Sequence, residues 1–191
     1  MKIEKRPATL LYPVPVVLVS CIGHEGTANI ITIAWVGTVC SDPPMLSISI
    51  RPSRYSHKLI TETREFVVNI PSADILDATD YCGIVSGRDV DKFTVTGLTP
   101  EPASKVKAPL IKECPMNMEC VVRQILNLGA HDMFIAEIVA VHQEEEVLDS
   151  HGHLDVQKAR PVVYNGAGQY WGGHECLATY GYAKKIFGES K

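Results

Sequence analysis

The sequence predicts a mainly β protein that also contains a few helices. Residues 31–36 and 45–50 each alternate between apolar and small or polar side chains, which is the pattern of a strand with one buried face. Between them, Asp42-Pro43-Pro44 forces a turn, because consecutive prolines cannot donate hydrogen bonds to a sheet. Two longer strand-like runs, 116–126 and 133–143, flank a turn-like segment, as in the long hairpin that completes a small barrel.

The size and composition of the chain suit a single globular domain. It has 191 residues, of which 46% are hydrophobic and 21% charged, enough to bury a core of its own. The formal net charge of -4 argues against broad binding to nucleic acid or to a membrane. The apolar N-terminal stretch is broken by Pro13 and Pro15 and lacks a cleavage site. We therefore expect no signal peptide, no transmembrane span and a cytoplasmic location.

The first predicted element is a strand over 14–22, which is rich in valine and therefore expected to be buried on both faces. Residues 24–27 have the chemistry of a turn, and they would join this strand as a hairpin to the one that begins at Asn29. The Asn29 side chain can close that turn by bonding its own backbone. The run 45–50 is then expected to lie antiparallel to 31–36 and close to it.

The basic loop after these strands favours an anion. Residues 51–58 (RPSRYSHK) hold four side chains that can be cationic, with two serines and a tyrosine. Ser56 is a suitable N-cap for a helix over 57–63, and a helix N-terminus offers free N–H groups and partial positive charge. Arg51 and Arg54 can add charge-assisted hydrogen bonds, for which phosphate is the natural acceptor. The alternative is a solvated loop that only caps the helix.

The later segments carry weaker signals. Ser72 is predicted to begin a second helix that ends near 83–87, and 161–164 forms a short strand. The glycine-rich segment 166–173 lacks the strand and helix context of a dinucleotide-binding loop. His151 and His153 could face one side of an extended chain, but no second pair of ligands is identifiable, and we predict no metal site.

The six cysteines are predicted to be reduced thiols. They are widely spaced, no C-x-x-C pair occurs, and no signal peptide is expected, so a disulfide framework is disfavoured. Walker A, G-x-S-x-G and H-E-x-x-H motifs are absent as well.

Residues 29–58, with a strand, DPP, a second strand and an R-x-S-x-Y-S-H loop, resemble the flavin reductase-like, FMN-binding split-barrel family. The likeness continues in 65–71 (EFVVNIP) and in 87–93 (GRDVDKF). Within the family it is greatest to the flavoredoxins and the related archaeal and bacterial flavin or ferric reductases. It covers roughly residues 10–170, and the order of the motifs carries it more than any single motif does.

This resemblance implies an FMN-binding split β-barrel with Greek-key-like topology, one domain over 1–191 with a C-terminal extension, and a homodimer. It implies FMN as cofactor, NAD(P)H or a protein as electron donor, and a flavin, a ferric complex or a protein as acceptor. It implies no catalytic side chain with an acid–base role. Phosphate contacts are expected from Arg51, Ser53, Arg54, Tyr55 and Ser56, with Arg88 and Lys92 as candidates for the phosphate or a dimer-related site. Contacts along the ribityl chain and ring are expected from Asn29, Thr32, Ala34, Trp35, Val36, Gly37, Thr38, Cys40 and Ser41.

Three functions stand side by side at this point. The first is a reductase that uses NAD(P)H to reduce FMN, ferric complexes or another acceptor. The second is an electron-carrier flavoprotein with a protein donor and no efficient NAD(P)H activity. The third is a barrel that binds flavin without turnover. Without a Rossmann unit, a nicotinamide would have to stack transiently on the bound flavin.

Overall fold

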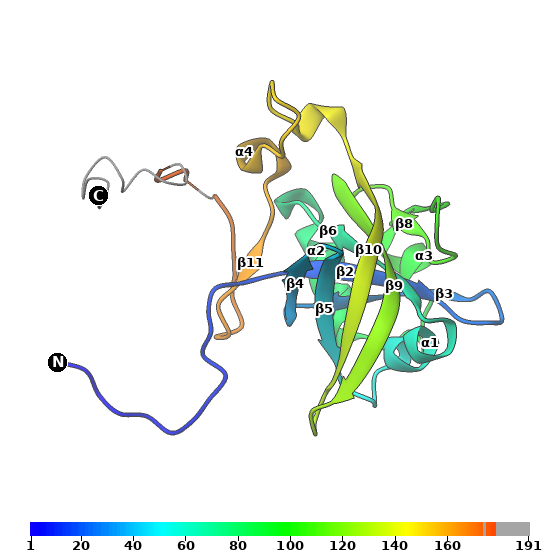
Figure 1. Cartoon of the computed structure of the whole chain (residues 1–191), viewed down its shortest axis with the longest axis horizontal. Coiled ribbons are helices and arrows are strands. Elements are labelled where there is room, and N and C mark those ends of the chain that lie inside the picture. The colour runs from blue at the N-terminus through cyan, green and yellow to red at the C-terminus, as the bar shows by residue number, and fades with distance from the viewer. Residues whose placement is uncertain (174, 179–191) are drawn as a thin grey trace.

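The computed structural model describes residues 1–173 and 175–178 of the chain. The body is a curved antiparallel sheet with helices packed beside it, and the N-terminal residues extend away from it (Figure 1). The strands are β1 (Val14–Pro15), β2 (Val17–Ile22), β3 (Ala28–Ile33), β4 (Val36–Ser41), β5 (Pro44–Ile50), β6 (Glu65–Ile70), β7 (Pro100–Glu101), β8 (Leu110–Ile111), β9 (Met116–Asn127), β10 (Asp132–Gln143), β11 (Val163–Tyr164) and β12 (Tyr170–Trp171). The helices are α1 (Tyr55–Thr63), α2 (Leu76–Ile84), α3 (Lys92–Thr96) and α4 (Val156–Ala159), with 3-10 turns at Ala73–Ile75 and Glu145–Val147.

The main sheet has seven strands in the order β3-β2-β6-β9-β10-β5-β4, and each neighbouring pair is antiparallel. Its two outermost strands, β3 and β4, follow one another in the sequence, so the sheet must curl until its edges approach each other. The amide of Ser49 in β5 donates a 2.9 Å hydrogen bond to the carbonyl of Trp35, in the short link between β3 and β4. The sheet is therefore curled but not closed, because its edge strands β3 and β4 are not paired with each other.

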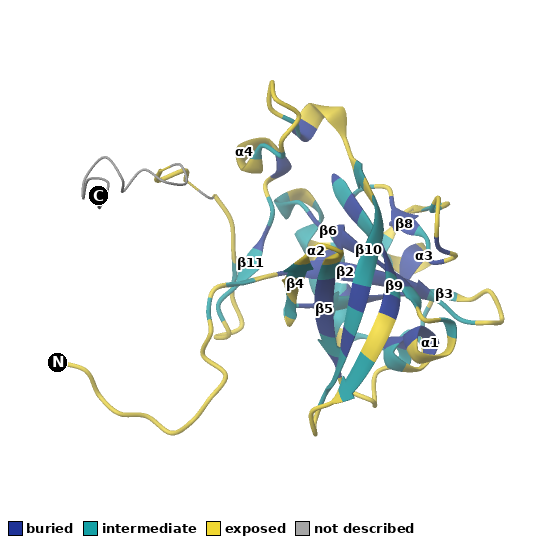
Figure 2. Cartoon of the chain, viewed as in Figure 1, coloured by how far each residue is buried: buried dark blue, intermediate teal, exposed yellow. Residues whose placement is uncertain are grey.

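The core lies inside this curl (Figure 2). The predicted alternation of β5 is confirmed, because Leu46, Ile48 and Ile50 are at most 3% exposed. The strand predicted over 14–22 is two strands. Burial on both faces is confirmed for β2, where 17–21 are all buried, but the short strand β1 belongs to another sheet and its Pro15 is exposed. Phe66 of β6 and Phe134 of β10 are fully buried and fill the centre of the curl.

Two local predictions are wrong. The run 31–36 is not one strand: β3 ends at Ile33, and Trp35 is 47% exposed rather than buried. The chain bends there because it must cross from one edge of the sheet to the other, and the small residues after it form β4 instead of a lead into the turn. The predicted N-cap is wrong too, because α1 begins at Tyr55 and its N-cap is Arg54. The Ser56 hydroxyl instead accepts a hydrogen bond from Asn29 in β3.

The predictions of a long hairpin and of a helical segment that begins at Ser72 are confirmed. The hairpin β9–β10 is the longest pairing in the sheet, and Ser72 opens the second helical segment by accepting a hydrogen bond from the amide of Asp74. Short strands β11 and β12 form a separate sheet with β1. All six cysteines are free thiols. In the described part of the chain, no helix is both long and apolar enough to cross a membrane. The tail beyond residue 178 lies outside the described residues.

Candidate functional site

A cavity of about 440 Å³ lies where the first turn of α1 meets β3, the loop 51–54 and the loop that follows α2. Eight of the residues predicted to bind the cofactor line this cavity. They come from four separate parts of the sequence. The predicted residues in its wall are Asn29, Arg51, Ser53, Arg54, Tyr55, Ser56, Arg88 and Lys92. We call it the phosphate cavity, because it combines a helix N-terminus with three arginines and a lysine.

Asn29 is fixed within this cavity and does not close the β2–β3 turn. Its side-chain nitrogen donates a 2.8 Å hydrogen bond to the hydroxyl of Ser56, and both residues are buried. Because the Ser56 oxygen accepts this bond, its own proton can be donated to a second acceptor, and the buried Cys21 thiol is one neighbour that interacts with this hydroxyl. Gly87 packs directly on the Asn29 amide: a Cβ at Gly87 would come within 2.0 Å of the Asn29 Oδ1 atom.

Arg88 closes one side of the cavity. Its guanidinium donates a 3.1 Å hydrogen bond to the carbonyl of Ser53 and lies 5.4 Å from the centre of the Tyr55 ring, a cation–π contact. The loop after α2 is thereby held against the loop before α1. Arg51 and Arg54 form no ion pair with any carboxylate of the described residues, and no Asp or Glu lines this cavity.

Lys92 forms part of the floor. It is only 4% exposed, and its Nζ donates hydrogen bonds of 2.7 Å to the carbonyls of Ile30 and Cys82. Burial lowers the pKa of this ammonium group, and the nearby positive charge of Arg54 acts in the same direction. The three available protons allow one further acceptor, so an anion in the cavity would be stabilised by the same group.

A second cavity, of about 320 Å³, continues from the first, and the two share Ile31, Arg51 and Arg54. We call it the ring cavity, because its wall includes the rings of Trp35, His131 and Tyr164. The indole of Trp35 and the imidazole of His131 are stacked, with centroids 5.3 Å apart and planes 8° from parallel. Burial and the charge of Arg51 lower the pKa of His131, which favours its neutral form.

Thr32 and Ala34, both predicted to bind the cofactor, also line the ring cavity. The Thr32 hydroxyl donates to the carbonyl of Thr79 in α2, so toward a ligand it can act only as an acceptor. His57 in α1 and Asp132 in β10 are 2.7 Å apart, and this contact holds the first turn of α1 against the β9–β10 hairpin. Asp132 also accepts a 2.8 Å hydrogen bond from Asn127 within the hairpin.

The remaining predicted residues lie on β4 and line neither cavity. They are Val36, Gly37, Thr38, Cys40 and Ser41. Val36 instead lines an apolar groove of about 370 Å³ between Trp35 and the N-terminal arm. The contact of these β4 residues with a cofactor stays a prediction.

Several lining residues were not predicted. Ser86 and Gly87 follow α2; Gly87 begins the motif 87–93, but neither residue was predicted to bind the cofactor. His131 lies in the β9–β10 turn, and Tyr164 lies in the short strand β11; neither carries a local motif. In the described part of the chain, no three His, Cys, Asp or Glu side chains are grouped so as to hold a metal ion, and this includes His151 and His153.

The fold is that of split-barrel proteins. A putative flavin reductase with a split barrel domain from Shewanella frigidimarina is 24% identical and superposes with a TM-score of 0.80, over 87% of this chain and 85% of that one. The chain belongs to the flavin reductase like domain family, whose model matches residues 9–172.

Relatives within reach of sequence comparison include two flavoredoxins of known structure. That of Desulfovibrio vulgaris (Miyazaki F) is 36% identical, with a TM-score of 0.90 over 96% of this chain and 99% of that chain. The flavoredoxin of Methanosarcina acetivorans is 33% identical, with a TM-score of 0.88 over 97% of this chain and 99% of that chain. An uncharacterized protein from Pyrococcus abyssi is 36% identical over 73% of this chain and 80% of its own length.

Proposed function

We propose that the two joined cavities bind FMN and that the protein is an FMN-dependent oxidoreductase of the flavin reductase type. One observation carries this proposal: a cationic cavity at a helix N-terminus opens into a cavity walled by aromatic rings, and no carboxylate lines either one. FMN has the matching parts in the same order, a phosphate, a polar ribityl chain and a planar ring. A Thermus thermophilus FMN-binding protein of similar fold, 25% identical with a TM-score of 0.82, supports the choice of flavin.

The phosphate end is assigned to residues of the first cavity. The backbone N–H groups at the start of α1 and the hydroxyls of Ser53 and Ser56 supply neutral donors. Arg51 and Arg54 supply charge-assisted ones. Tyr55 bears its ring against Arg88 and so keeps that guanidinium at the rim. Lys92 adds positive charge from below, at a position where burial strengthens its field.

The ring end is assigned to the second cavity. Trp35 and His131 offer flat surfaces, and the link that carries Trp35 forms part of the cavity wall. The bound flavin would supply the redox chemistry, accepting electrons from a donor and passing them to an acceptor. The chain's own residues bind and orient the cofactor and set the charge around it, and none is assigned acid–base work.

The donor and acceptor are proposed from the family. NAD(P)H or a protein reduces the flavin, and a flavin, a ferric complex or a protein accepts the electrons. The two flavoredoxins among the similar structures favour an electron-carrier role as the second candidate. Anaerobic addition of NADH or NADPH to the flavin-loaded protein, followed by absorption, decides between them. Bleaching of the flavin bands supports the reductase, and bands that persist until dithionite is added support the carrier. A protein that takes up no FMN would contradict the proposal.

A homodimer is part of the same proposal. The N-terminal arm is exposed along its length (Figure 2). Large apolar side chains are exposed on this arm and on the edge strand β4, where a second copy could cover them. They are Leu10 (63% exposed) and Leu11 (87%) on the arm and Val39 (51%) on β4, and Trp35 (47%) is exposed in the link just before β4. Sedimentation equilibrium that gives the monomer mass would contradict the dimer.

We further propose that 1–191 form one domain with a C-terminal extension, and that the protein works in the cytoplasm, where its six free thiols would stay reduced.

A further inference from the structure

Gly87 and Arg88 separate two cavities. On one side lies the phosphate cavity; on the other lies a third cavity of about 490 Å³, and both residues line both spaces. The second space extends toward Thr27, Phe93 and Pro100, away from the ring cavity. The peptide of these two residues is therefore a wall at the end of the site where a phosphate would lie.

The wall is held in place from several directions. Gly87 touches the Asn29 amide so closely that a Cβ would lie 2.0 Å from its oxygen. Arg88 reaches back to the Ser53 carbonyl through its guanidinium, and its own amide donates a 3.2 Å hydrogen bond to the Ser86 hydroxyl. The wall thus depends on a glycine at one position and on an arginine at the next.

The sign of charge changes across the wall. The phosphate cavity is lined by four cationic side chains and no carboxylate, whereas Asp89 and Asp91 line the third cavity. Asp91 is held by Thr94, whose hydroxyl donates a 2.6 Å hydrogen bond to its carboxylate. The hydrogen bonds from Thr94 lower the pKa of Asp91, so its negative charge is retained at neutral pH. A ligand that continued past its first phosphate with a second negative group would be repelled by the carboxylates of Asp89 and Asp91.

We infer that Gly87 and Arg88 are specificity determinants that restrict the cofactor to a flavin ending in a phosphate monoester and exclude FAD. FMN ends at the wall, and its phosphate lies among the cations. FAD carries a second phosphate and an adenosine, which would have to displace the Arg88 side chain and enter a space lined by Asp89 and Asp91. This inference rests on the proposed binding of FMN.

The test compares the dissociation constants of FMN, FAD and riboflavin, measured by titration of flavin fluorescence with the intact protein. The wild type is expected to bind FMN at least about tenfold more tightly than FAD, which corresponds to about 1.4 kcal/mol. Gly87→Ala would push Asn29 and the wall apart and so reduce the preference for FMN. Arg88→Gln should reduce it as well, because it removes the hydrogen bond to the Ser53 carbonyl without burying a new group. Riboflavin, which lacks the phosphate, should respond far less to either variant.

Two further variants sharpen the result. Asp89→Asn should tighten FAD binding relative to FMN, because it removes like charge beyond the wall without touching the phosphate cavity. Gly172→Ala is the matched control, since a Cβ there meets nothing within 4 Å and its φ is ordinary; it should leave all three constants unchanged. Equal binding of FMN and FAD by the wild type would overturn the inference and leave the flavin site standing. No binding of any flavin would instead overturn the proposed function.

Discussion

The side-chain amide of Asn29 donates a 2.8 Å hydrogen bond to the hydroxyl of Ser56 and ties β3 to the first turn of α1. Asn29 is 3% exposed and Ser56 is 1% exposed, so neither group can exchange this partner for water. Both residues line the phosphate cavity. The bond thereby fixes the position of the helix N-terminus relative to the strand that carries the rest of the site.

This bond predicts a measurable coupling between the two residues. Asn29→Ala and Ser56→Ala should each lower the free energy of unfolding, and the double variant should lose less than the sum by about 0.5–1.5 kcal/mol. Urea denaturation of the four proteins measures the coupling. The exposed ion pair of Arg123 and Glu137 is the matched control, since its partners are 52% and 30% exposed and their coupling should stay below about 1 kcal/mol. Strict additivity of the Asn29 and Ser56 effects would contradict the prediction.

Arg51 is predicted to bind the phosphate directly. Arg51→Ala should weaken FMN binding by about 1.5–3 kcal/mol, the usual contribution of a hydrogen bond to a charged group. Riboflavin binding should change much less, because riboflavin has no phosphate. Lys58→Ala is the control, since Lys58 lies on the same helix with its side chain 65% exposed and paired with Glu62. If FMN and riboflavin lost affinity equally, Arg51 would not be the phosphate ligand.

Trp35 is predicted to report on the cofactor. The chain has two tryptophans, and only Trp35 lines the ring cavity, whereas Trp171 lies on β12. Addition of FMN should therefore quench the tryptophan fluorescence of the wild type. Trp35→Phe should remove most of that quenching, and the matched variant Trp171→Phe should retain it. Quenching that follows Trp171 instead would place the flavin ring elsewhere on the protein.

The elements with strong local patterns could be predicted from the sequence. The alternation of β5, the valine content of β2 and the turn between β9 and β10 each depend on neighbouring residues. Strand β4 could not, because its small and hydroxylated residues have no alternating apolar pattern, and it forms through its pairing with β5. For the same reason the break at Trp35 is a property of the curled sheet and not of the local sequence.

Much of the candidate site could also be predicted from the sequence, because several of the residues that line the phosphate cavity lie close together in the basic loop 51–58. The part that could not be predicted consists of contacts between distant segments. Ser56 bonds Asn29, which lies 27 positions earlier, and this bond replaces its expected role as N-cap. His131 and Gly87 reach the cavities only through the β9–β10 turn and the end of α2. A single sequence gives no sign that such residues face one another.

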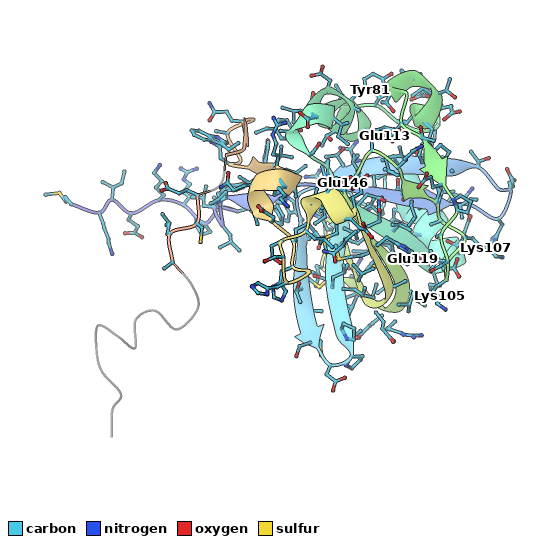
Figure 3. All side chains as sticks on the ribbon, turned by 90° about the horizontal axis from the view of Figure 1, so that it is seen from above. Tyr81, Lys105, Lys107, Glu113, Glu119 and Glu146 are labelled. Carbon is cyan, nitrogen blue, oxygen red and sulfur yellow. The ribbon has the colours of Figure 1, made fainter. Side chains whose placement is uncertain are left out.

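Glu119 in β9 provides a prediction about stability, away from the candidate site. Its carboxylate is fully buried and accepts hydrogen bonds of 2.6–2.9 Å from the amides of Ser104, Lys105 and Val106, from the Ser104 hydroxyl and from His142. Figure 3 shows it beside the segment that carries Lys105. Burial alone would raise the pKa of this group, but the hydrogen bonds prevail and lower it from 4.5 to about 2.

Because the folded pKa of Glu119 lies below the ordinary value, the carboxylate stabilises the fold fully above about pH 4.5 and progressively less as the pH falls toward about 2. Glu119→Gln places an N–H₂ group against backbone donors and should lower the free energy of unfolding at neutral pH by about 1.5–3 kcal/mol. The loss should shrink at acid pH, where the wild-type carboxylate is protonated as well. Urea denaturation across this range checks both effects. Glu137→Gln, at the exposed ion pair, should cost less than about 1 kcal/mol, and a deficit of Glu119→Gln that stayed constant with pH would contradict the assignment.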